Sequence, residues 1–166
     1  MRHQVVRLRT EDLRAVTDIY NAACRAREST QGTRPWSVDD MNTFLFKTRP
    51  SFESYSCLIN GAVAGWAAFT RYSVKEDVKH TVEMSLYVQK PFRRMGVGTA
   101  LANTLLKRAR ILDLHCIFAI VFREPPYVAS FATGKCGFSD VGCLPEVFSN
   151  ERKHYDLLLL EKLMTT

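Results

Sequence analysis

Two arginines and two glycines stand together where a predicted strand gives way to a predicted helix. The strand is expected over Thr81–Val88, and it is followed by Arg93, Arg94, Gly96 and Gly98. Glycine lets the backbone approach a ligand closely, and the unpaired amides of a first helical turn attract anions. We therefore predict that this connection holds a pyrophosphate group. The alternative is a plain turn with solvated arginines.

Two other phosphate-binding motifs are excluded by the same residues. A Walker loop requires G-x-x-x-x-G-K-S/T, a string that the sequence does not contain. A Rossmann fingerprint requires a small residue where Leu101 stands and an acidic residue after the next strand, where Arg123 stands instead. The segment is thus an anion site of a different kind.

The elements that must position this segment follow from the patterns on either side of it. Asn60-Gly61 between two apolar runs is a strong hairpin signal, and the unbroken apolar run Cys116–Phe122 is typical of a strand covered on both faces. Ser37 with Asp40 predicts a capped short helix. The expected strands are 5–8, 55–59, 62–69, 81–88, 116–122, 139–148 and 155–160, and the expected helices are 10–27, a short one from 37, 96–112 and 127–135.

This order of elements predicts an α/β fold of the mixed α+β kind. We expect a single domain, residues 1–166, with a mixed central sheet and helices on both of its faces. Thr10, followed by Glu11 and Asp12, is expected to cap the first helix.

The composition is that of an ordinary globular chain. It has 166 residues, 46% of them hydrophobic, and 23 Lys and Arg against 17 Asp and Glu give a net charge of +6. The positive charge favours an anionic partner. The sequence shows no DNA-recognition helix and no aromatic RNA-binding strand, so we do not expect the chain to bind nucleic acid. Lys107, Arg108 and Arg110 lie opposite the leucines of their helix and are expected to be solvated.

Several other classes of protein are not expected. No apolar run approaches the roughly 18 residues of a membrane-spanning helix, and the first residues form no signal-peptide core. Five cysteines and four histidines show neither paired nor metal-ligand spacing. We therefore expect no membrane association, no metal site, reduced thiols and a cytoplasmic location.

The segment from strand to helix resembles the GNAT superfamily of acetyl-CoA-dependent N-acetyltransferases. The signature of that superfamily is R/Q-x-x-G-x-G/A, which Arg93, Gly96 and Gly98 meet. The resemblance covers nearly the whole chain and is closest to the phosphinothricin acetyltransferase-like branch. The residues that resemble this branch are Ile19-Tyr20-Asn21, Thr81–Val88, Gly137-Phe138 and Tyr155-Asp156.

By this resemblance the cofactor is acetyl-CoA. Its pyrophosphate would lie on the amides of residues 93–99, and its pantetheine arm would pair with the backbone of residues 86–88. The strands Thr81–Val88 and Cys116–Phe122 would splay apart to admit the thioester, within a mostly antiparallel sheet of about six to seven strands. The residues expected to bind the cofactor are thus Leu86, Tyr87, Val88, Arg93, Arg94, Met95, Gly96, Val97, Gly98 and Thr99.

The same resemblance assigns the general base to Glu83. Strand alternation puts Glu83 on the same side as Ser85 and Tyr87. An amine arrives protonated and must lose a proton before it attacks a thioester. A carboxylate with a raised pKa in a partly dry cleft can accept that proton. The open alternative is a surface glutamate paired with a lysine.

The chain departs from the superfamily where the leaving thiolate would be protonated. An asparagine is usual near the position of Pro126, and a tyrosine or histidine is usual at that of Thr133. Because threonine is a poor acid, Tyr127 is a candidate for this role. Two alternatives stay open, namely that Tyr127 is a packing aromatic and that the thiolate leaves unaided.

The acceptor site is predicted from segments that border it in the family. These segments carry Trp36, Phe69, Arg71 and Tyr72, and Tyr155 is a further candidate. An Arg71 that faced the cleft would suit a substrate carboxylate. The alternative is that Trp36 and Phe69 belong to the core and that Arg71 is solvated.

We expect the chain to transfer acetyl from acetyl-CoA to the primary amine of a small molecule. The acceptor implied by the resemblance is an amino acid or an analogue of the phosphinothricin or methionine sulfone type. The alternatives are acetylation of a protein N-terminus or an amine-bearing antibiotic, and a catalytically weak acyl-CoA-binding module, since one fold hosts many substrates. The resemblance also implies a homodimer.

Overall fold

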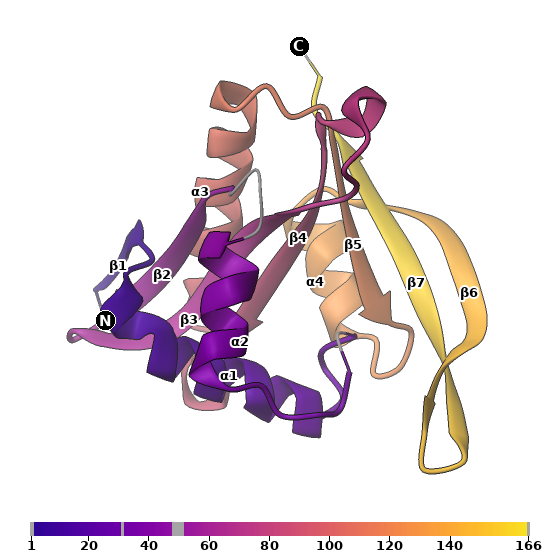
Figure 1. The fold of residues 1–166 in the computed structure, drawn as a ribbon, viewed down its shortest axis with the longest axis horizontal. Helices are drawn as coiled ribbons and strands as arrows, with labels where there is room; N and C mark the ends of the chain where they lie inside the picture. The colour runs from indigo at the N-terminus through magenta and orange to yellow at the C-terminus, as the bar shows by residue number, and fades with distance from the viewer. Residues whose placement is uncertain (1, 31, 48–51, 166) are drawn as a thin grey trace.

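The computed structural model describes residues 2–30, 32–47 and 52–165, and these residues form a seven-stranded mixed sheet (Figure 1). Its strands are β1 (His3–Arg7), β2 (Ser54–Ile59), β3 (Ala62–Arg71), β4 (Thr81–Val88), β5 (Cys116–Phe122), β6 (Ser139–Asn150) and β7 (Lys153–Leu163). They lie in the order β1-β2-β3-β4-β5-β7-β6. The β4–β5 pair is parallel and every other neighbouring pair is antiparallel. The predicted fold class is confirmed.

Local signals explain the strands nearest the anion-binding segment. Asn60 and Gly61 have positive φ angles of 50° and 80°, as the two central residues of a tight hairpin turn require, and β2 pairs with β3 on either side of them. The predicted bounds of β4 and β5 are those observed. β6 and β7 extend beyond their predicted ends, because they pair with each other as far as Asn150 and Lys153.

The helices are α1 (Leu13–Arg25), α2 (Val38–Asn42), α3 (Val97–Ile111) and α4 (Tyr127–Lys135). Ser37 caps α2 as predicted, since its Oγ accepts from the amide of Asp40 at 3.1 Å and the Asp40 carboxylate accepts from the amide of Ser37 at 2.9 Å. The predicted cap at Thr10 is wrong. Residues Thr10–Asp12 form a 3-10 turn before α1, and the Asp12 carboxylate accepts the amide and guanidinium of Arg9 instead.

The helices cover both faces of the sheet (Figure 1). On one face, α1 and α2 pack against β3 in a cluster that includes Tyr20, Met41 and Trp66. On the other face, α3 and α4 pack on β3, β4 and β5, with Leu101 and Leu105 fully buried. Both faces of β3 are therefore covered by apolar side chains. β5 was predicted to be covered on both faces, but five of its seven residues are only half-buried.

The sheet opens between β4 and β5. Thr81, Val82 and Glu83 pair with Cys116, Ile117 and Phe118, and within the described chain the pairing of these two strands ends there. Both strands nevertheless continue, and their outer edges stay paired with β3 and β7. The predicted splay is confirmed, and it begins at Glu83.

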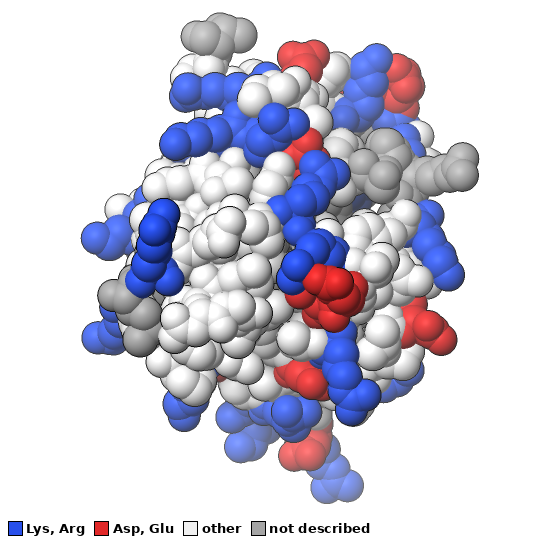
Figure 2. All heavy atoms as spheres, turned by 90° about the vertical axis from the view of Figure 1, so that its left-hand side faces the viewer, with Lys and Arg blue, Asp and Glu red and all other residues white. Residues whose placement is uncertain are grey.

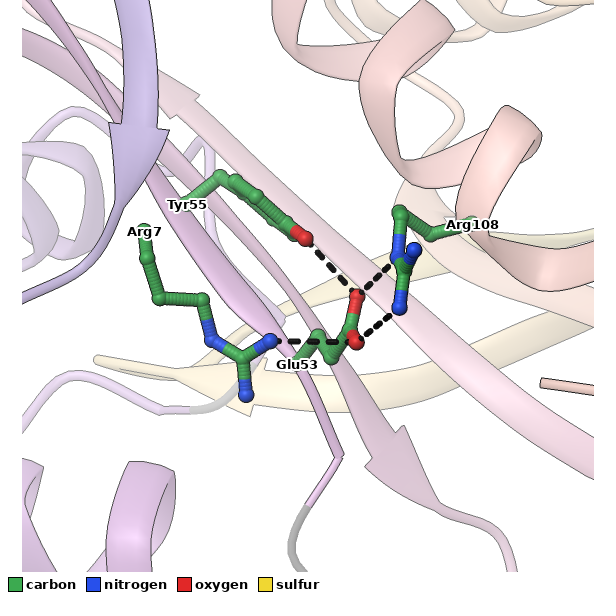
Figure 3. A network of polar contacts seen from close by, with 4 residues as sticks. All are labelled: Arg7, Glu53, Tyr55 and Arg108. Atoms are coloured by element: carbon green, nitrogen blue, oxygen red, sulfur yellow. Dashed lines mark hydrogen bonds and ion pairs between the residues drawn. The ribbon is translucent and has the colours of Figure 1, made fainter. Parts of the chain in front are cut away.

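An ion cluster centred on the buried Glu53 ties α3 to the sheet edge formed by β1 and β2 (Figure 3). Arg108 donates from Nε and Nη2 to the two carboxylate oxygens of Glu53 at 2.7 and 2.6 Å. Arg7 Nη1 lies 3.0 Å from Oε1 of Glu53, and the Tyr55 hydroxyl donates to Oε2 at 2.8 Å. The bonds from Arg108 hold the pKa of Glu53 at about 2. The expectation that Arg108 is simply solvated is therefore wrong.

Basic side chains are spread over the surface. On the face turned to the viewer in Figure 2, Lys and Arg lie at several separate places around a broad uncharged area, some of them beside acidic side chains. The charge on this face is therefore not gathered into one stripe. Within the described residues, no helix is long and apolar enough to cross a membrane.

Candidate active site

A cleft of about 1200 Å³ lies where β4 and β5 separate. Its walls come from the second half of β4, from β5, from the first turn of α3 and from α4, and residues at and just after the end of α1 also line it. The lining is mainly apolar beside the two strands, with Met84, Leu86, Ala119 and Val121, and carries cations near α3. Such a cleft suits a long ligand with one apolar and one anionic part.

The first turn of α3 supplies the anion-binding end of the cleft. Gly96 precedes the helix with a φ of 84°, a left-handed conformation that favours glycine. The amide of Ala100 donates to the carbonyl of Gly96 at 2.9 Å. The amides of residues 97–99 come before this bond and have no acceptor within the helix. Amides in this position, aligned with the helix dipole, bind phosphate groups.

Gly98 allows α3 to approach α4 closely. A Cβ added at Gly98 would come within 3.2 Å of Cζ of Phe131, which lines the cleft from α4. The second glycine of the motif therefore has a packing role in addition to any contact with a ligand.

The predicted cofactor residues line the cleft with two exceptions. Val97 is 1% exposed and its side chain belongs to the core beneath α3, while Met95 is exposed and does not line the cleft. Leu86, Tyr87 and Val88 lie on the stretch of β4 that has no pairing to β5 in the described chain. The backbone groups of this open edge can pair with an extended ligand, as an added strand would.

Among the described residues, three cationic side chains line the cleft. One of them, Arg93, is already bound by other groups of the protein. Arg93 donates from Nε to the carbonyl of Val88 at 3.1 Å, and its Nη2 lies 2.7 Å from Oε2 of Glu28. Arg94 and Lys135 are the other two. Arg93 therefore shapes the segment that links β4 to α3, as well as contributing charge.

Glu83 lies at the point where β4 and β5 part. It pairs in register with Thr70 of β3 and with Phe118 of β5. The side chain is half-buried, and burial raises the pKa of its carboxyl above the usual 4.5. Among the described residues no side chain donates a hydrogen bond to this carboxylate. Glu83 does not itself line the cleft, but Tyr87, further along the same face of β4, does.

The start of α4 carries the candidate acid. Tyr127 lines the cleft, and the pKa of its phenol is raised by burial and by a hydrogen bond to the Glu28 carboxylate. Thr133 does not line the cleft, and its hydroxyl donates to the carbonyl of Ala129 at 3.0 Å. The hydroxyl of Thr133 therefore cannot take the place of the tyrosine or histidine that the superfamily usually has there.

Two of the predicted acceptor residues lie on the face of the sheet that carries Glu83. The ring of Tyr72 contacts that of Phe118, the register partner of Glu83, with centroids 5.2 Å apart. The ring of Trp36 lies 4.4 Å from that of Tyr20, which in turn contacts the Tyr87 ring at 5.6 Å. These aromatic contacts connect the α1–α2 side of the molecule to the cleft.

The other predicted acceptor residues lie elsewhere. Phe69 is 3% exposed and belongs to the core on the opposite face of the sheet, so it packs rather than borders an acceptor. Arg71, two residues further along β3, donates to the carbonyls of Ser73 and Val74 at 2.5 and 3.2 Å. Tyr155 accepts a hydrogen bond from Arg27, whose guanidinium lies 5.2 Å from the centre of its ring. None of the three lines the cleft.

Some residues that line the cleft were not singled out from the sequence. Lys135 stands in the K-x-G-F string that ends α4, so the motif could have pointed to it. Glu28 follows α1 without any motif, and only the folded chain brings it to Arg93. A search of the described residues finds no group of three or more His, Cys, Asp and Glu placed to hold a metal ion.

Comparisons with known proteins agree with this geometry. The Acetyltransferase (GNAT) family model matches residues 13–138. The Bacillus subtilis protein YwnH, whose name gives it a provisional phosphinothricin acetyltransferase assignment, is 32% identical over 153 residues, 90% of this chain and 91% of YwnH. The L-methionine sulfoximine/L-methionine sulfone acetyltransferase of Pseudomonas aeruginosa is 28% identical over 155 residues, 90% of this chain and 88% of that protein.

A solved structure shows the same fold. The crystal structure of a GNAT superfamily phosphinothricin acetyltransferase from Sinorhizobium meliloti in complex with AcCoA has a TM-score of 0.89 at 21% identity, over 99% of this chain and 89% of that one. The cleft described above offers what acetyl-CoA needs, namely free amides at a helix end for the phosphates and an open strand edge for the pantetheine. The chain belongs to the acetyltransferase (GNAT) family and is an acetyl-CoA-dependent N-acetyltransferase.

Proposed function

We propose that this enzyme acetylates the primary amine of a small carboxylate-bearing molecule, an amino acid or an analogue of one, with Glu83 as general base. The observation that carries the proposal is the end of β4–β5 pairing at Glu83. A thioester that reaches between the two strands arrives beside this carboxylate. The names of the two relatives, which refer to phosphinothricin and to methionine sulfoximine and sulfone, support an amino-acid analogue as acceptor.

The chain's own residues would hold the cofactor at three places. The amides of residues 97–99 and the side chains of Arg93, Arg94 and Lys135 would bind the phosphates, and the open edge of β4 would bind the pantetheine arm. When bound, acetyl-CoA supplies the activated acetyl group. The apolar lining from Leu86 and Val121 would exclude water around the thioester.

Glu83 would accept the proton that the amine must lose. Its carboxylate has no hydrogen-bond donor among the described residues and a pKa raised by burial, so it is a stronger base than an exposed glutamate. Tyr127, the acid candidate that lines the cleft, would donate the proton to the leaving thiolate. Its phenol stays protonated at neutral pH because its pKa is raised above 10.

The acceptor would bind on the face of the sheet beneath α1 and α2. Tyr72 and Trp36 are the acceptor candidates that this placement supports. The Tyr72 ring contacts Phe118, the register partner of Glu83, and the Trp36 ring connects through Tyr20 to Tyr87 on the same face of β4. The proposal extends to a single domain over residues 1–166, a homodimer and a cytoplasmic location. Sedimentation of the purified chain measures the oligomeric state.

A thiol-release assay tests the proposal. The wild-type chain is given acetyl-CoA with amino acids, their sulfone and phosphinate analogues, polyamines, aminoglycosides and short peptides. We expect release with the amino acids or analogues and a loss of kcat of at least about a hundredfold in Glu83→Gln, with acetyl-CoA affinity unchanged. The matched control is Glu161→Gln, since Glu161 also pairs with Phe118, from β7. Unchanged turnover in Glu83→Gln, or a loss in the control alone, would refute the role of Glu83.

A further inference from the structure

A carboxylate stands beside the phosphate-binding end of the cleft. Glu28 lies three residues beyond the end of α1 and lines the cleft together with Arg93, whose Nη2 is 2.7 Å from Glu28 Oε2. The two side chains are 14% and 33% exposed, respectively. A negative charge at a site for an anionic ligand opposes binding, so this placement requires an explanation.

The backbone around Glu28 is fastened to both strands that splay apart. Its own amide donates to the carbonyl of Ala23 at 2.8 Å. The next residue, Ser29, makes a 2.9 Å hydrogen bond to the hydroxyl of Tyr87 on β4, and Thr30 donates to the carbonyl of Ile120 on β5 at 3.1 Å. These bonds fix the backbone of residues 28–30 beside the cleft, so the Glu28 carboxylate stays within a side chain's reach of Arg93 when a ligand enters.

Two features tie this carboxylate to the cofactor end of the cleft. It neutralises Arg93, the arginine of the family signature, at the start of the segment that leads into α3. Its charge also helps to raise the pKa of the Tyr127 phenol, which lines the same cleft. A pyrophosphate held at the start of α3 would be a second anion beside the Arg93 guanidinium, and it would compete with Glu28 for that guanidinium.

We propose that Glu28 weakens the affinity of the cleft for acetyl-CoA and CoA by competing with their phosphates for Arg93. The inference rests on the assignment of the cleft to acetyl-CoA. Glu28 in this role speeds the release of CoA, because the Arg93 guanidinium can pair with the Glu28 carboxylate as the phosphates leave it. Glu28 is thus a positioning residue that acts through Arg93.

Calorimetric titration with CoA and with acetyl-CoA tests the inference without any turnover. We expect Glu28→Gln to bind both ligands about fivefold to tenfold more tightly than the wild-type chain, as removal of one nearby like charge predicts. Product inhibition by CoA should strengthen by the same factor. The matched control is Glu76→Gln, which breaks an exposed ion pair with Lys79 and lies away from the cleft. Its affinity for CoA should equal that of the wild-type chain.

A double-mutant cycle with Arg93→Gln separates competition from a structural role. If Glu28 competes for the guanidinium, Arg93→Gln costs more affinity in the Glu28→Gln background than in the wild-type chain. Weaker or unchanged CoA binding in Glu28→Gln, with an unaltered melting temperature, would overturn the inference. Glu28→Ala repeats the test without the glutamine amide, whose oxygen could accept a hydrogen bond from Arg93. Failure of the wild-type chain to bind CoA would instead overturn the assignment of the cleft.

Discussion

Replacing Glu53 by glutamine removes the centre of the ion cluster that fastens α3 to the sheet (Figure 3). The carboxylate is 8% exposed and accepts two bonds from Arg108 and one from Tyr55, besides its contact with Arg7. Glutamine keeps the shape of the side chain but loses its charge and one of its two acceptors. Arg108, 34% exposed, then turns partly to water. The perturbation is therefore electrostatic and leaves no cavity.

The size of the effect follows from the pKa of Glu53. The cluster lowers it from 4.5 to about 2, which corresponds to about 3 kcal/mol of stability at neutral pH. The share of Arg7 is screened because that side chain is 60% exposed. We therefore expect Glu53→Gln to lower the free energy of unfolding by about 2–3 kcal/mol, a fall in Tm of roughly 4–12 °C for a chain of this size.

Thermal unfolding followed by circular dichroism measures this difference. Because the pKa of Glu53 is lower in the folded state than in the unfolded state, its contribution is present above about pH 4.5 and is lost as the pH falls toward 2. The gap in Tm between wild type and variant should therefore be full at pH 7 and narrow below pH 4.5. Glu76→Gln, in an exposed pair with Lys79, should change Tm by less than about 2 °C. A Tm for Glu53→Gln within 2 °C of wild type, or a gap that persists unchanged at pH 3, would refute the reasoning.

Three further predictions concern the site. The acid limb of kcat/KM should lie above pH 4.5, because burial raises the pKa of Glu83 and the base must be deprotonated. A pH–rate profile in which Glu83→Gln keeps that limb would contradict this assignment. Gly98→Ala should weaken CoA binding severalfold in calorimetry, because its Cβ would lie 3.2 Å from Phe131 Cζ, and Phe131→Leu in the same chain should restore the affinity. Asn21→Ala removes two hydrogen bonds to the backbone of Trp36, so it should lower the free energy of unfolding by about 1–3 kcal/mol and raise KM for the amine more than KM for acetyl-CoA.

Short-range patterns were sufficient to predict the elements around the cleft. The bounds of β4, β5 and α4 are those predicted, because the two strands have clear apolar patterns and α4 ends just before Gly137, which has a positive φ. The glycine turn before α3 was predictable for the same reason, since its glycines and its helix start are adjacent in sequence. The cap at Thr10 was not, because two carboxylates follow it and Asp12 takes the hydrogen bonds of Arg9.

Contacts between distant residues could not be predicted from the same patterns. Arg108 is 55 residues from Glu53 in sequence, and nothing in the helical pattern of α3 indicates which charge lies opposite its polar face. The ion pair of Glu28 with Arg93 likewise depends on how the segment after α1 crosses the opening in the sheet. The charge of the cleft could therefore not be predicted from its motif alone.

The residues predicted for the acceptor site show that closeness in sequence does not place side chains in one site. Phe69, Arg71 and Tyr72 are close in sequence, but the pleat of β3 sends Phe69 and Arg71 to the face opposite Glu83, while Tyr72 follows the strand and contacts Phe118. Once the register of β3 against β4 is known, alternation along β3 shows which of its residues share a face with Glu83. Register is a property of the paired strands, and the sequence of one strand does not contain it.

The ion cluster and the binding site are two ends of one helix. Arg108 lies in the last turn of α3 and is fastened through Glu53 to β1 and β2, while the first turn of α3 presents its amides to the cleft. Fixed donors are more effective than mobile ones, because they do not have to be reorganised when charge arrives. In the binding mode proposed above, Arg108 would therefore serve anion binding without touching the anion. Part of the excess of basic residues would then act by holding the helix in place and only part by attracting the ligand.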